Sequence, residues 1–391
     1  MTTGFPGIDP ATARAEIDLA AFRGNLAAIQ RHVGDSRLMV VVKADGYGHG
    51  MLACAREARI AGADWLGVAT PAEALALRDD GDSGLILAWL YGPDEDLTDL
   101  VAADVDISAQ SLDQLSRLAA AAATAERRAR VHLKIDTGLS RNGARPQIWP
   151  DVCAAAAEGE AAGALHVVGI WSHFAAADEP GHPATDRQID AFVDAEKVAR
   201  GAGLQPELRH LSNSAAALVI PEARLDLVRI GIAAYGIDPA PGIAASAGVE
   251  LRPVMTLRAQ LLNVKELSAG DGVSYGWTWV ADEPTTVGLV PLGYADGVPR
   301  HAGNAARVGW RGGQAPVRGR ICMDQFVVDL GPQPASAADE VIIFGAGDLG
   351  EPTAADWATW CGTIGYEIVT RIGPRVRRVF RNAGEPDAQA G

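Results

Sequence analysis

The stretch Leu38-Met39-Val40-Val41-Val42-Lys43-Ala44-Asp45-Gly46-Tyr47-Gly48-His49-Gly50 is the most informative segment of the chain. Its five leading apolar residues predict a buried strand, and its three glycines predict a tight turn after that strand. A lysine at the end of a buried strand suits a group that loses its proton and forms an imine with a carbonyl cofactor. A lysine that extends its ammonium group to solvent is the alternative, and this stretch alone leaves both open.

The composition describes a globular chain with a sizeable core. The 391 residues are 48% hydrophobic and 21% charged, which suggests one large domain plus another, or three small ones. The net charge of −15 argues against a nucleic acid or an anionic membrane as the main partner, because no basic surface is available. The four cysteines are widely spaced without a C-x-x-C pair, so neither a disulfide framework nor a structural zinc site is expected.

The N-terminal residues 1–7 lack the charged and apolar regions of a secretory signal. No apolar run approaches the ~18 residues that a membrane-spanning helix needs. The sequence therefore predicts a cytoplasmic protein.

Strand-like and helix-like segments alternate through the first part of the chain. Strands are expected at residues 38–42, 65–69, 85–89, 105–107, 131–135, 167–171, 208–211 and 227–230. Thr70-Pro71-Ala72-Glu73 predicts a helix start with a capping residue, a proline and a capping-box glutamate. Eight such units match a (β/α)8 barrel, although alternation alone also allows an open doubly wound sheet.

The pattern changes near residue 240. A Pro-, Gly- and Ala-rich stretch at 239–248 predicts a linker, and short strands are expected beyond it at 255–264, 286–290, 326–330, 340–344 and 376–380, with one helix near 353–360. The predicted organisation is an N-terminal segment 1–13, flexible or packed on the C-terminal domain, a barrel at 14–240, and a mainly β domain at 249–391.

In a barrel of this kind the functional site lies at the carboxyl ends of the strands. These ends supply Lys43 and Tyr47, the segment 134–141, His173, the segment 210–214, and the segment 229–232. A phosphate site built from Gly231, Ile232 and nearby hydroxyl groups, together with an imine-forming lysine, points to pyridoxal phosphate. Taken singly, Gly231 also fits an ordinary turn, Ser214 a helix cap, and each histidine a core or loop position.

The segment 41–50 resembles the cofactor-lysine signature of alanine racemases. Further matches follow in order at residues 136–143, 211–214, 228–233, 273–276, 293–297, 319–325 and 366–367. This resemblance covers nearly the whole chain and implies a barrel followed by a β domain, in agreement with the prediction from the residue pattern.

The resemblance implies two acid/base residues, Lys43 and Tyr275. Racemisation removes a proton from one side of Cα and returns it on the other, so one base on each face is the direct solution. Within the family the tyrosine comes from the other subunit of a head-to-tail homodimer. Without the resemblance, Tyr275 would be interpreted as an aromatic residue buried in a strand turn.

The resemblance also assigns the remaining site residues, and it implies no metal. Arg229 would meet the pyridine nitrogen, Arg141 the cofactor phenolate and the substrate carboxylate, and the Met323 backbone the substrate. Lys134 matches a position that is carbamylated in some members. The other cofactor-binding positions are Tyr47, His173, Asn213, Ser214, Gly231, Ile232 and Tyr366, and the entrance positions are Tyr294, Arg300, Arg320 and Asp324.

The function implied is interconversion of L- and D-alanine, supplying D-alanine for peptidoglycan. A broad-specificity racemase shares most of these motifs, and Trp277 and Trp279 depart from the common pattern near the site. A non-catalytic pyridoxal-phosphate carrier would lack the second domain, and a basic-amino-acid decarboxylase would place its lysine in a different context.

Overall fold

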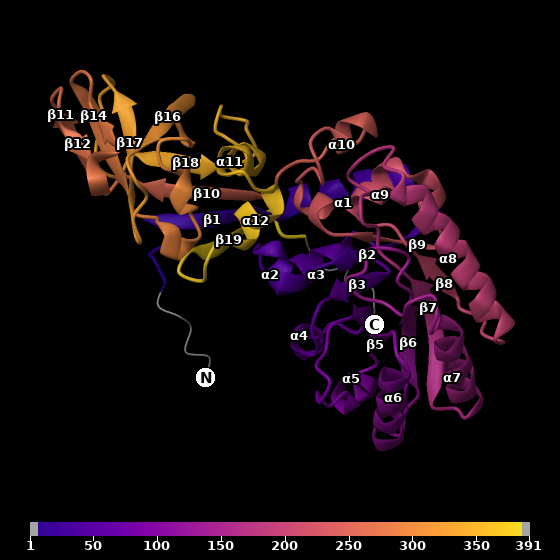
Figure 1. Cartoon of the computed structure of the whole chain (residues 1–391). Helices are drawn as coiled ribbons and strands as arrows, with labels where there is room; N and C mark the ends of the chain where they lie inside the picture. The colour runs from indigo at the N-terminus through magenta and orange to yellow at the C-terminus, as the bar shows by residue number, and fades with distance from the viewer. Residues whose placement is uncertain (1–6, 385–391) are drawn as a thin grey trace.

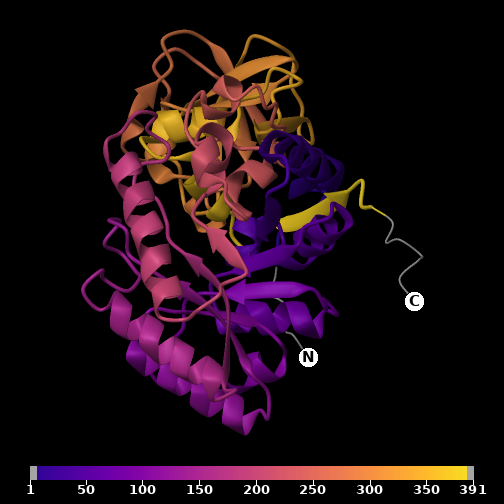
Figure 2. The same ribbon diagram turned by 90° about the vertical axis from the view of Figure 1, so that its right-hand side faces the viewer.

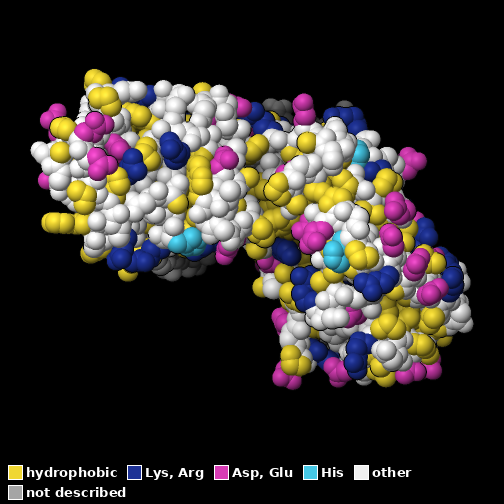
Figure 3. Space-filling view, turned by 45° about the horizontal axis from the view of Figure 1, so that its top comes forward, with side chains coloured by type: hydrophobic (Ala, Val, Ile, Leu, Met, Phe, Trp, Pro, Cys, Tyr) yellow, Lys and Arg dark blue, Asp and Glu magenta, His cyan; other side chains and the backbone are white. Residues whose placement is uncertain are grey.

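The computed structural model describes residues 7–384, which form a barrel and a second, mainly β domain (Figure 1). The segments 1–6 and 385–391, which belong to the predicted terminal regions, lie outside the described residues. The two domains form separate lobes with a broad concave surface between them (Figure 3). No helix within residues 7–384 is both long enough and apolar enough to span a bilayer.

The first domain is an eight-stranded parallel sheet in the order β8-β7-β6-β5-β4-β3-β2-β9. Its strands are β2 (Arg37–Val41), β3 (Trp65–Val68), β4 (Leu85–Ala88), β5 (Asp106–Ala109), β6 (Ala129–Lys134), β7 (Leu165–Trp171), β8 (Leu208–His210) and β9 (Leu227–Ile230). The two outer strands approach each other, because Asp226 donates its N–H to Arg209 O (3.2 Å) and Arg229 to Ser212 O (3.1 Å). The sheet is therefore a nearly closed barrel, which confirms the predicted fold class.

Helices surround the barrel strands (Figure 2). They are α1 (Leu19–Val33), α3 (Met51–Ile60), α4 (Pro71–Asp79), α5 (Thr98–Ala102), α6 (Leu112–Thr124), α7 (Trp149–Ala161), α8 (Ala184–Gly201) and α9 (Ser214–Val219). The predicted capping box at α4 is present: Thr70 Oγ1 accepts from Glu73 N, and Glu73 Oε2 accepts from Thr70 N. The barrel interior is filled by Met39, Trp65, Leu87, Val168, Leu208 and Leu227.

The second domain is built on a nine-stranded sheet in the order β11-β14-β17-β16-β15-β18-β10-β1-β19. Its strands are β1 (Ala13–Asp18), β10 (Met255–Gln260), β11 (Asn263–Leu267), β14 (Thr285–Val290), β15 (Arg307–Trp310), β16 (Gly313–Arg318), β17 (Phe326–Gly331), β18 (Glu340–Phe344) and β19 (Arg377–Arg381). A two-stranded ribbon of β12 (Gly272–Val273) and β13 (Trp279–Val280) and the helices α11 (Ala354–Cys361) and α12 (Gly365–Thr370) complete it.

Strand β1 corrects the predicted boundary at residue 14. It pairs antiparallel with β10 and parallel with β19, so residues 13–18 belong to the sheet of the second domain. Ala13, Ala15 and Ile17 are buried and alternate with polar residues, as in a strand with one covered face. The expected strand 255–264 is likewise two strands, and the expected linker contains the short helix α10 (Ile243–Ser246).

Candidate active site

A cavity of about 600 Å³ opens at the carboxyl ends of the barrel strands. All ten predicted cofactor-binding positions line it, and so does Lys134: the wall contains Lys43, Tyr47, Lys134, Arg141, His173, Asn213, Ser214, Arg229, Gly231, Ile232 and Tyr366. Tyr366 comes from α12 of the second domain, so both domains contribute to the wall.

Lys43 is held by a strained turn at the end of β2. Ala44, Asp45 and Tyr47 have φ values of 53°, 53° and 52°, a left-handed conformation that costs free energy in residues other than glycine. Two side chains from elsewhere fix the turn: Glu73 Oε1 accepts from Ala44 N (2.7 Å), and Arg378 donates to Gly48 O (2.9 Å). The capping-box glutamate therefore also orders the lysine loop, and β19 anchors that loop to the second domain.

At one end of the cavity a glycine allows a tyrosine hydroxyl to lie directly against the backbone. A Cβ atom on Gly231 would lie 2.3 Å from Tyr47 Oη, so a side chain at this position is sterically excluded. Ser214 Oγ accepts from Gly231 N (2.9 Å), which joins the start of α9 to the end of β9. A short 3₁₀ helix, Ile232–Tyr235, begins directly after Gly231. First-turn N–H groups of helices favour anions, and two such turns start at this wall.

The electrostatics of the cavity are strongly cationic. Lys43, Lys134, Arg141 and Arg229 line it, and no Asp or Glu is among the lining residues of the described chain. Burial, and then the positive charges of Arg141 and Arg229, lower the pKa of Lys43. Burial and the same two arginines lower the pKa of Lys134 to about 7. Both lysines are thereby shifted toward neutral amines, and the cavity as a whole favours an anionic ligand.

Arg229 lies at the centre of a dense framework of acceptors. It is 4% exposed, and its guanidinium donates to the carbonyl oxygens of Ser172 (2.8 Å), His210 (3.0 Å) and Leu211 (2.9 Å). It also contacts the Nδ1 atoms of His173 (3.2 Å) and His210 (3.1 Å). Burial lowers the pKa of Arg229 to about 9, so the group remains protonated at neutral pH. The framework fixes the position of a permanent cation.

The other predicted residues lie in the second domain, away from this cavity. Tyr275 follows β12, which lies at the end of the second domain remote from the barrel (Figure 1). Tyr275 is 69% exposed and Met323 is 54% exposed. Ser274 Oγ donates to Arg320 O (2.6 Å), and Tyr294 N donates to Cys322 O (3.1 Å), so the three motif segments around 274, 294 and 322 form one exposed cluster.

The remaining entrance positions belong to the same domain. Asp324 pairs with Arg375 (2.8 Å), which also binds Asp296, and Arg300 begins the 3₁₀ helix Arg300–Ala302. None of Tyr275, Tyr294, Arg300, Arg320, Met323 and Asp324 lines the barrel cavity within the described chain. A single copy therefore does not bring the predicted pair Lys43 and Tyr275 together.

Two tryptophans of the cavity wall were not predicted. Lys43 Nζ lies 5.6 Å from the ring centroid of Trp89, and Lys134 Nζ lies 4.1 Å from that of Trp171. Asn142 and Thr370 also line the cavity. A tryptophan at the end of an apolar strand resembles a core residue in sequence. Its position at a carboxyl strand end, where the functional site was expected, could have indicated that it lines the cavity.

The fold and the cavity define a class: two-domain (β/α)8 proteins with a cationic pocket and a buried lysine at the carboxyl ends of the strands. Family models agree and are more specific. The N-terminal domain of alanine racemase matches residues 17–239, and its C-terminal domain matches residues 254–380.

Individual relatives match over almost the full length. The chain is 51% identical to the alanine racemase of Frankia casuarinae over 377 residues, covering 96% of this chain and 98% of that protein. The solved alanine racemase of Streptomyces lavendulae superposes with a TM-score of 0.93 at 49% identity, covering 96% and 98% of the two chains. That of Streptomyces coelicolor gives 0.92 at 50% identity, covering 95% and 98%. The chain belongs to the alanine racemase family.

Proposed function

We propose that this protein is a pyridoxal-phosphate-dependent alanine racemase that supplies D-alanine for peptidoglycan in the cytoplasm. The observation that carries the proposal is the cavity that combines a half-buried lysine on a strained turn with three further basic side chains. The family membership supports the choice of reaction.

The residues of the cavity fit pyridoxal phosphate. The backbone at Gly231, with Tyr47 Oη and Ser214 Oγ beside it, suits a phosphate, because the missing side chain lets the Tyr47 hydroxyl approach and two helix starts adjoin it. The cationic wall compensates the charges of a phosphate and a carboxylate. When bound, the cofactor supplies a carbonyl for Lys43 and a conjugated ring that withdraws electrons from the substrate Cα. Tyr47, His173, Asn213, Ser214, Gly231, Ile232 and Tyr366 are the residues assigned to hold it.

The proton transfers are assigned to Lys43 and Tyr275. The lowered pKa of Lys43 increases the fraction of neutral amine, which is the form that accepts a proton. Tyr275 would act from the opposite face. Its 69% exposure on the far end of the second domain supports a homodimer in which the partner copy supplies Tyr275 and Met323 to this cavity.

The two arginines and Lys134 have supporting roles in this proposal. Arg229 remains charged and would leave the pyridine nitrogen unprotonated, which limits electron withdrawal and side reactions. Arg141 would bind the substrate carboxylate, and Lys134, as a neutral amine, is able to take up CO2 as a carbamate that pairs with Arg141. The entrance would be formed by Tyr294, Arg300, Arg320 and Asp324.

The test is chiral analysis of the purified protein, loaded with pyridoxal phosphate, given L-alanine and separately L-serine, L-lysine and L-arginine. Lys43→Ala and Tyr275→Phe accompany the wild type, and Lys197→Ala is the control because Lys197 is an exposed lysine of α8. D-alanine as the main product, lost in the first two variants and kept in the control, is the expected result.

Other outcomes would change the proposal in defined ways. Faster production of D-serine or D-lysine would keep the mechanism and indicate a broad-specificity racemase. No D-amino acid from protein that has bound its cofactor would contradict the racemase and favour a non-catalytic carrier.

A further inference from the structure

A row of buried polar side chains crosses the barrel interior beneath the cavity. Asp106, His132 and His210 are each 0% exposed, although the interior around them is mainly apolar. His132 Nε2 lies 3.0 Å from Asp106 Oδ2, His132 Nδ1 lies 2.8 Å from His210 Nε2, and His210 Nδ1 lies 3.1 Å from Arg229 Nη1. The row begins at the first residue of β5 and ends at the cationic wall.

The direction of these hydrogen bonds is determined by chemistry. An arginine only donates, so His210 Nδ1 accepts, and a neutral His210 then carries its proton on Nε2. That proton goes to His132 Nδ1, which leaves the His132 proton on Nε2, facing Asp106. Burial and neighbouring positive charge hold the pKa of His210 well below its usual value, which agrees with a neutral ring. Every donor therefore points from Arg229 toward Asp106.

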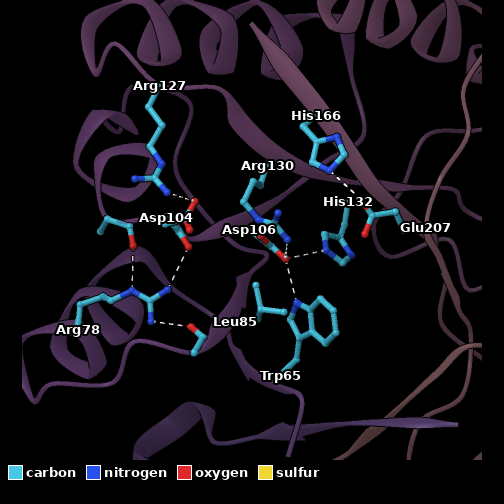
Figure 4. A network of polar contacts seen from close by, with 12 residues as sticks. Trp65, Arg78, Leu85, Asp104, Asp106, Arg127, Arg130, His132, His166 and Glu207 are labelled. Atoms are coloured by element: carbon cyan, nitrogen blue, oxygen red, sulfur yellow. Dashed lines mark hydrogen bonds and ion pairs between the residues drawn. The ribbon is translucent and has the colours of Figure 1, made fainter. Parts of the chain in front are cut away.

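Asp106 is built to be the terminal acceptor. It accepts hydrogen bonds from Trp65 Nε1 (2.9 Å), from the guanidinium of Arg130 and from His132, and all three partners are drawn in Figure 4. Burial opposes its ionisation, but the hydrogen bonds that it accepts from His132 and Arg130, and the charge of Arg130, lower the pKa of Asp106. An ionised carboxylate is an acceptor only, so it does not reverse the row.

The backbone is also adapted to the row. The pairing of β6 with β7 shifts register between Val131 and His132, so that His132 lies opposite Gly169. A Cβ on Gly169 would approach His132 Nδ1 to 3.1 Å and Leu208 O to 3.0 Å, closer than ordinary contacts. Trp171 stacks on His210 at 5.4 Å with an interplanar angle of 9°. The bulge, the glycine and the tryptophan together hold both imidazoles in place.

We propose that Asp106 and His132 are positioning residues that, through His210, fix the orientation of Arg229 by keeping each imidazole in its Nε2–H tautomer. This inference rests on the proposed function, in which Arg229 meets the cofactor ring. It assigns a role to two residues that do not line the cavity. A reversed tautomer in either imidazole would turn an N–H of His210 toward the guanidinium and displace it.

The direct test is ¹⁵N NMR of the imidazoles in the wild-type protein, with the His132 signals assigned from a His132→Phe variant. Both His132 and His210 are expected to carry their proton on Nε2. A proton on Nδ1 of either ring would overturn the proposal, whether or not the protein is a racemase.

The functional test compares Asp106→Leu with Asp106→Asn. An asparagine keeps an oxygen toward His132, although its NH2 group no longer accepts from the half-buried Arg130, whereas leucine removes both acceptors. Asp106→Leu is expected to lower kcat roughly 10-fold or more with little change in KM, and to raise the pyruvate formed per racemisation as alanine loses its amino group to the cofactor. Asp106→Asn should retain most of the wild-type values.

Controls separate this role from general stability. Asp104→Asn removes a nearby carboxylate that pairs with Arg127 (2.7 Å) outside the row, and it should change neither kcat nor the pyruvate yield. His132→Phe tests the same link if Asp106→Leu does not fold, because both changes should act on Arg229. If both variants fold, their effects should be non-additive in the double variant. Equal loss of activity in the leucine and asparagine variants, or an unchanged pyruvate yield in Asp106→Leu and His132→Phe, would contradict the proposal.

Discussion

The barrel cavity and the exposed cluster around Tyr275 show two different ways of preparing a site. In the cavity the deepest groups are buried: Arg229 is 4% exposed and Lys134 5%, and Arg229 donates to three backbone carbonyl oxygens. In the cluster, Tyr275 and Met323 are more than half exposed, and backbone contacts among three motif segments supply the order.

The difference is informative about assembly. A group that reacts in a dry, cationic pocket needs partners around it before the ligand arrives. A group that is completed by another molecule needs only a stable backbone and an accessible side chain. The cavity has such partners around its buried groups, whereas the cluster has an ordered backbone and accessible side chains. For this reason we propose that the cavity and the cluster of one site belong to different copies of the chain.

The largest expected effect tests this division directly. Lys43→Ala and Tyr275→Phe should each reduce racemisation on the order of 10³-fold or more, because each removes one of two acid/base groups. Co-expression of the two variants should restore about a quarter of the wild-type activity, since half of the dimers are hybrids and each hybrid has one intact site. The measurement is alanine racemisation by the co-expressed mixture and by tagged hybrids separated from it, which should retain about half of the wild-type activity.

The matched control pairs Lys43→Ala with the double variant Lys43→Ala/Tyr275→Phe, which leaves no intact site in any hybrid. If hybrids of the two single variants form and stay inactive, the cavity and the cluster do not act together across copies.

Arg229→Glu should have the next largest effect, and it tests the barrel cavity without involving the cluster around Tyr275. A carboxylate accepts a proton, so it should favour a protonated pyridine nitrogen and stronger electron withdrawal than the guanidinium allows. We expect racemisation to fall roughly 100-fold, with a stronger long-wavelength absorption band after alanine is added and more pyruvate. Visible spectroscopy is the measurement.

Arg229→Lys is the matched variant, because it keeps the charge and loses the planar fork. A spectrum of Arg229→Glu that does not change on alanine addition would show that Arg229 does not control the ring nitrogen.

Local sequence patterns predicted some parts of the structure, and contacts between distant segments explain the parts that were missed. The eight barrel strands were predicted because their apolar runs and turns are local signals, as in Met39 to Val42. Strand β1 was missed because its partners begin at Met255 and Arg377, and no local pattern reports a pairing so distant in sequence. The proposed catalytic roles came from a family resemblance; residue spacing alone did not reveal that Tyr275 is exposed.

The polar row from Asp106 to His210 could not be predicted from the sequence for a related reason. Asp106 begins a strand, and His132 alternates with apolar neighbours, which is the pattern of an ordinary barrel strand. A β-bulge at Val131 and His132 sets the ring direction, and bulges have no reliable single-sequence signal.

Gly231→Ala should have a smaller effect, confined to cofactor binding. The added Cβ would lie 2.3 Å from Tyr47 Oη and would displace that hydroxyl from the proposed phosphate site. We expect the Kd for pyridoxal phosphate to rise roughly 10-fold, with less change in kcat at saturating cofactor. Fluorescence titration of apoenzyme measures it.

Two variants sharpen this prediction. Gly201→Ala is the control, because Gly201 lies in α8 and a Cβ added there would meet nothing within 4 Å. Tyr47→Phe alone removes the hydroxyl that the added Cβ would displace, so it should raise the Kd by a similar factor. An unchanged Kd in Tyr47→Phe would show that this hydroxyl does not hold the phosphate.

The last expected effect concerns pH and Lys134, and it acts on stability and not on catalysis. Burial, followed by the charges of Arg229 and Arg141, lowers the pKa of Lys134 in the folded protein to about 7 from 10.5. Between these values the unfolded chain binds a proton that the folded chain does not, so the free energy of unfolding should rise with pH across this window, by about 1.4 kcal/mol per pH unit from this group. Urea unfolding of CO2-free protein at pH 7 and pH 9, compared with Lys134→Met, isolates the contribution.

Bicarbonate turns this measurement into a test of carbamylation. A carbamate on Lys134 is an anion beside Arg229 and Arg141, so added bicarbonate should stabilise the wild type at pH 7 and leave Lys134→Met unchanged. Lys197→Met is the matched control, because Lys197 is exposed and its pairing with Asp194 raises its pKa. If Lys134→Met has the same pH dependence as the wild type, the cavity holds Lys134 charged. The barrel wall would then tolerate a complete set of four cations before any anion binds.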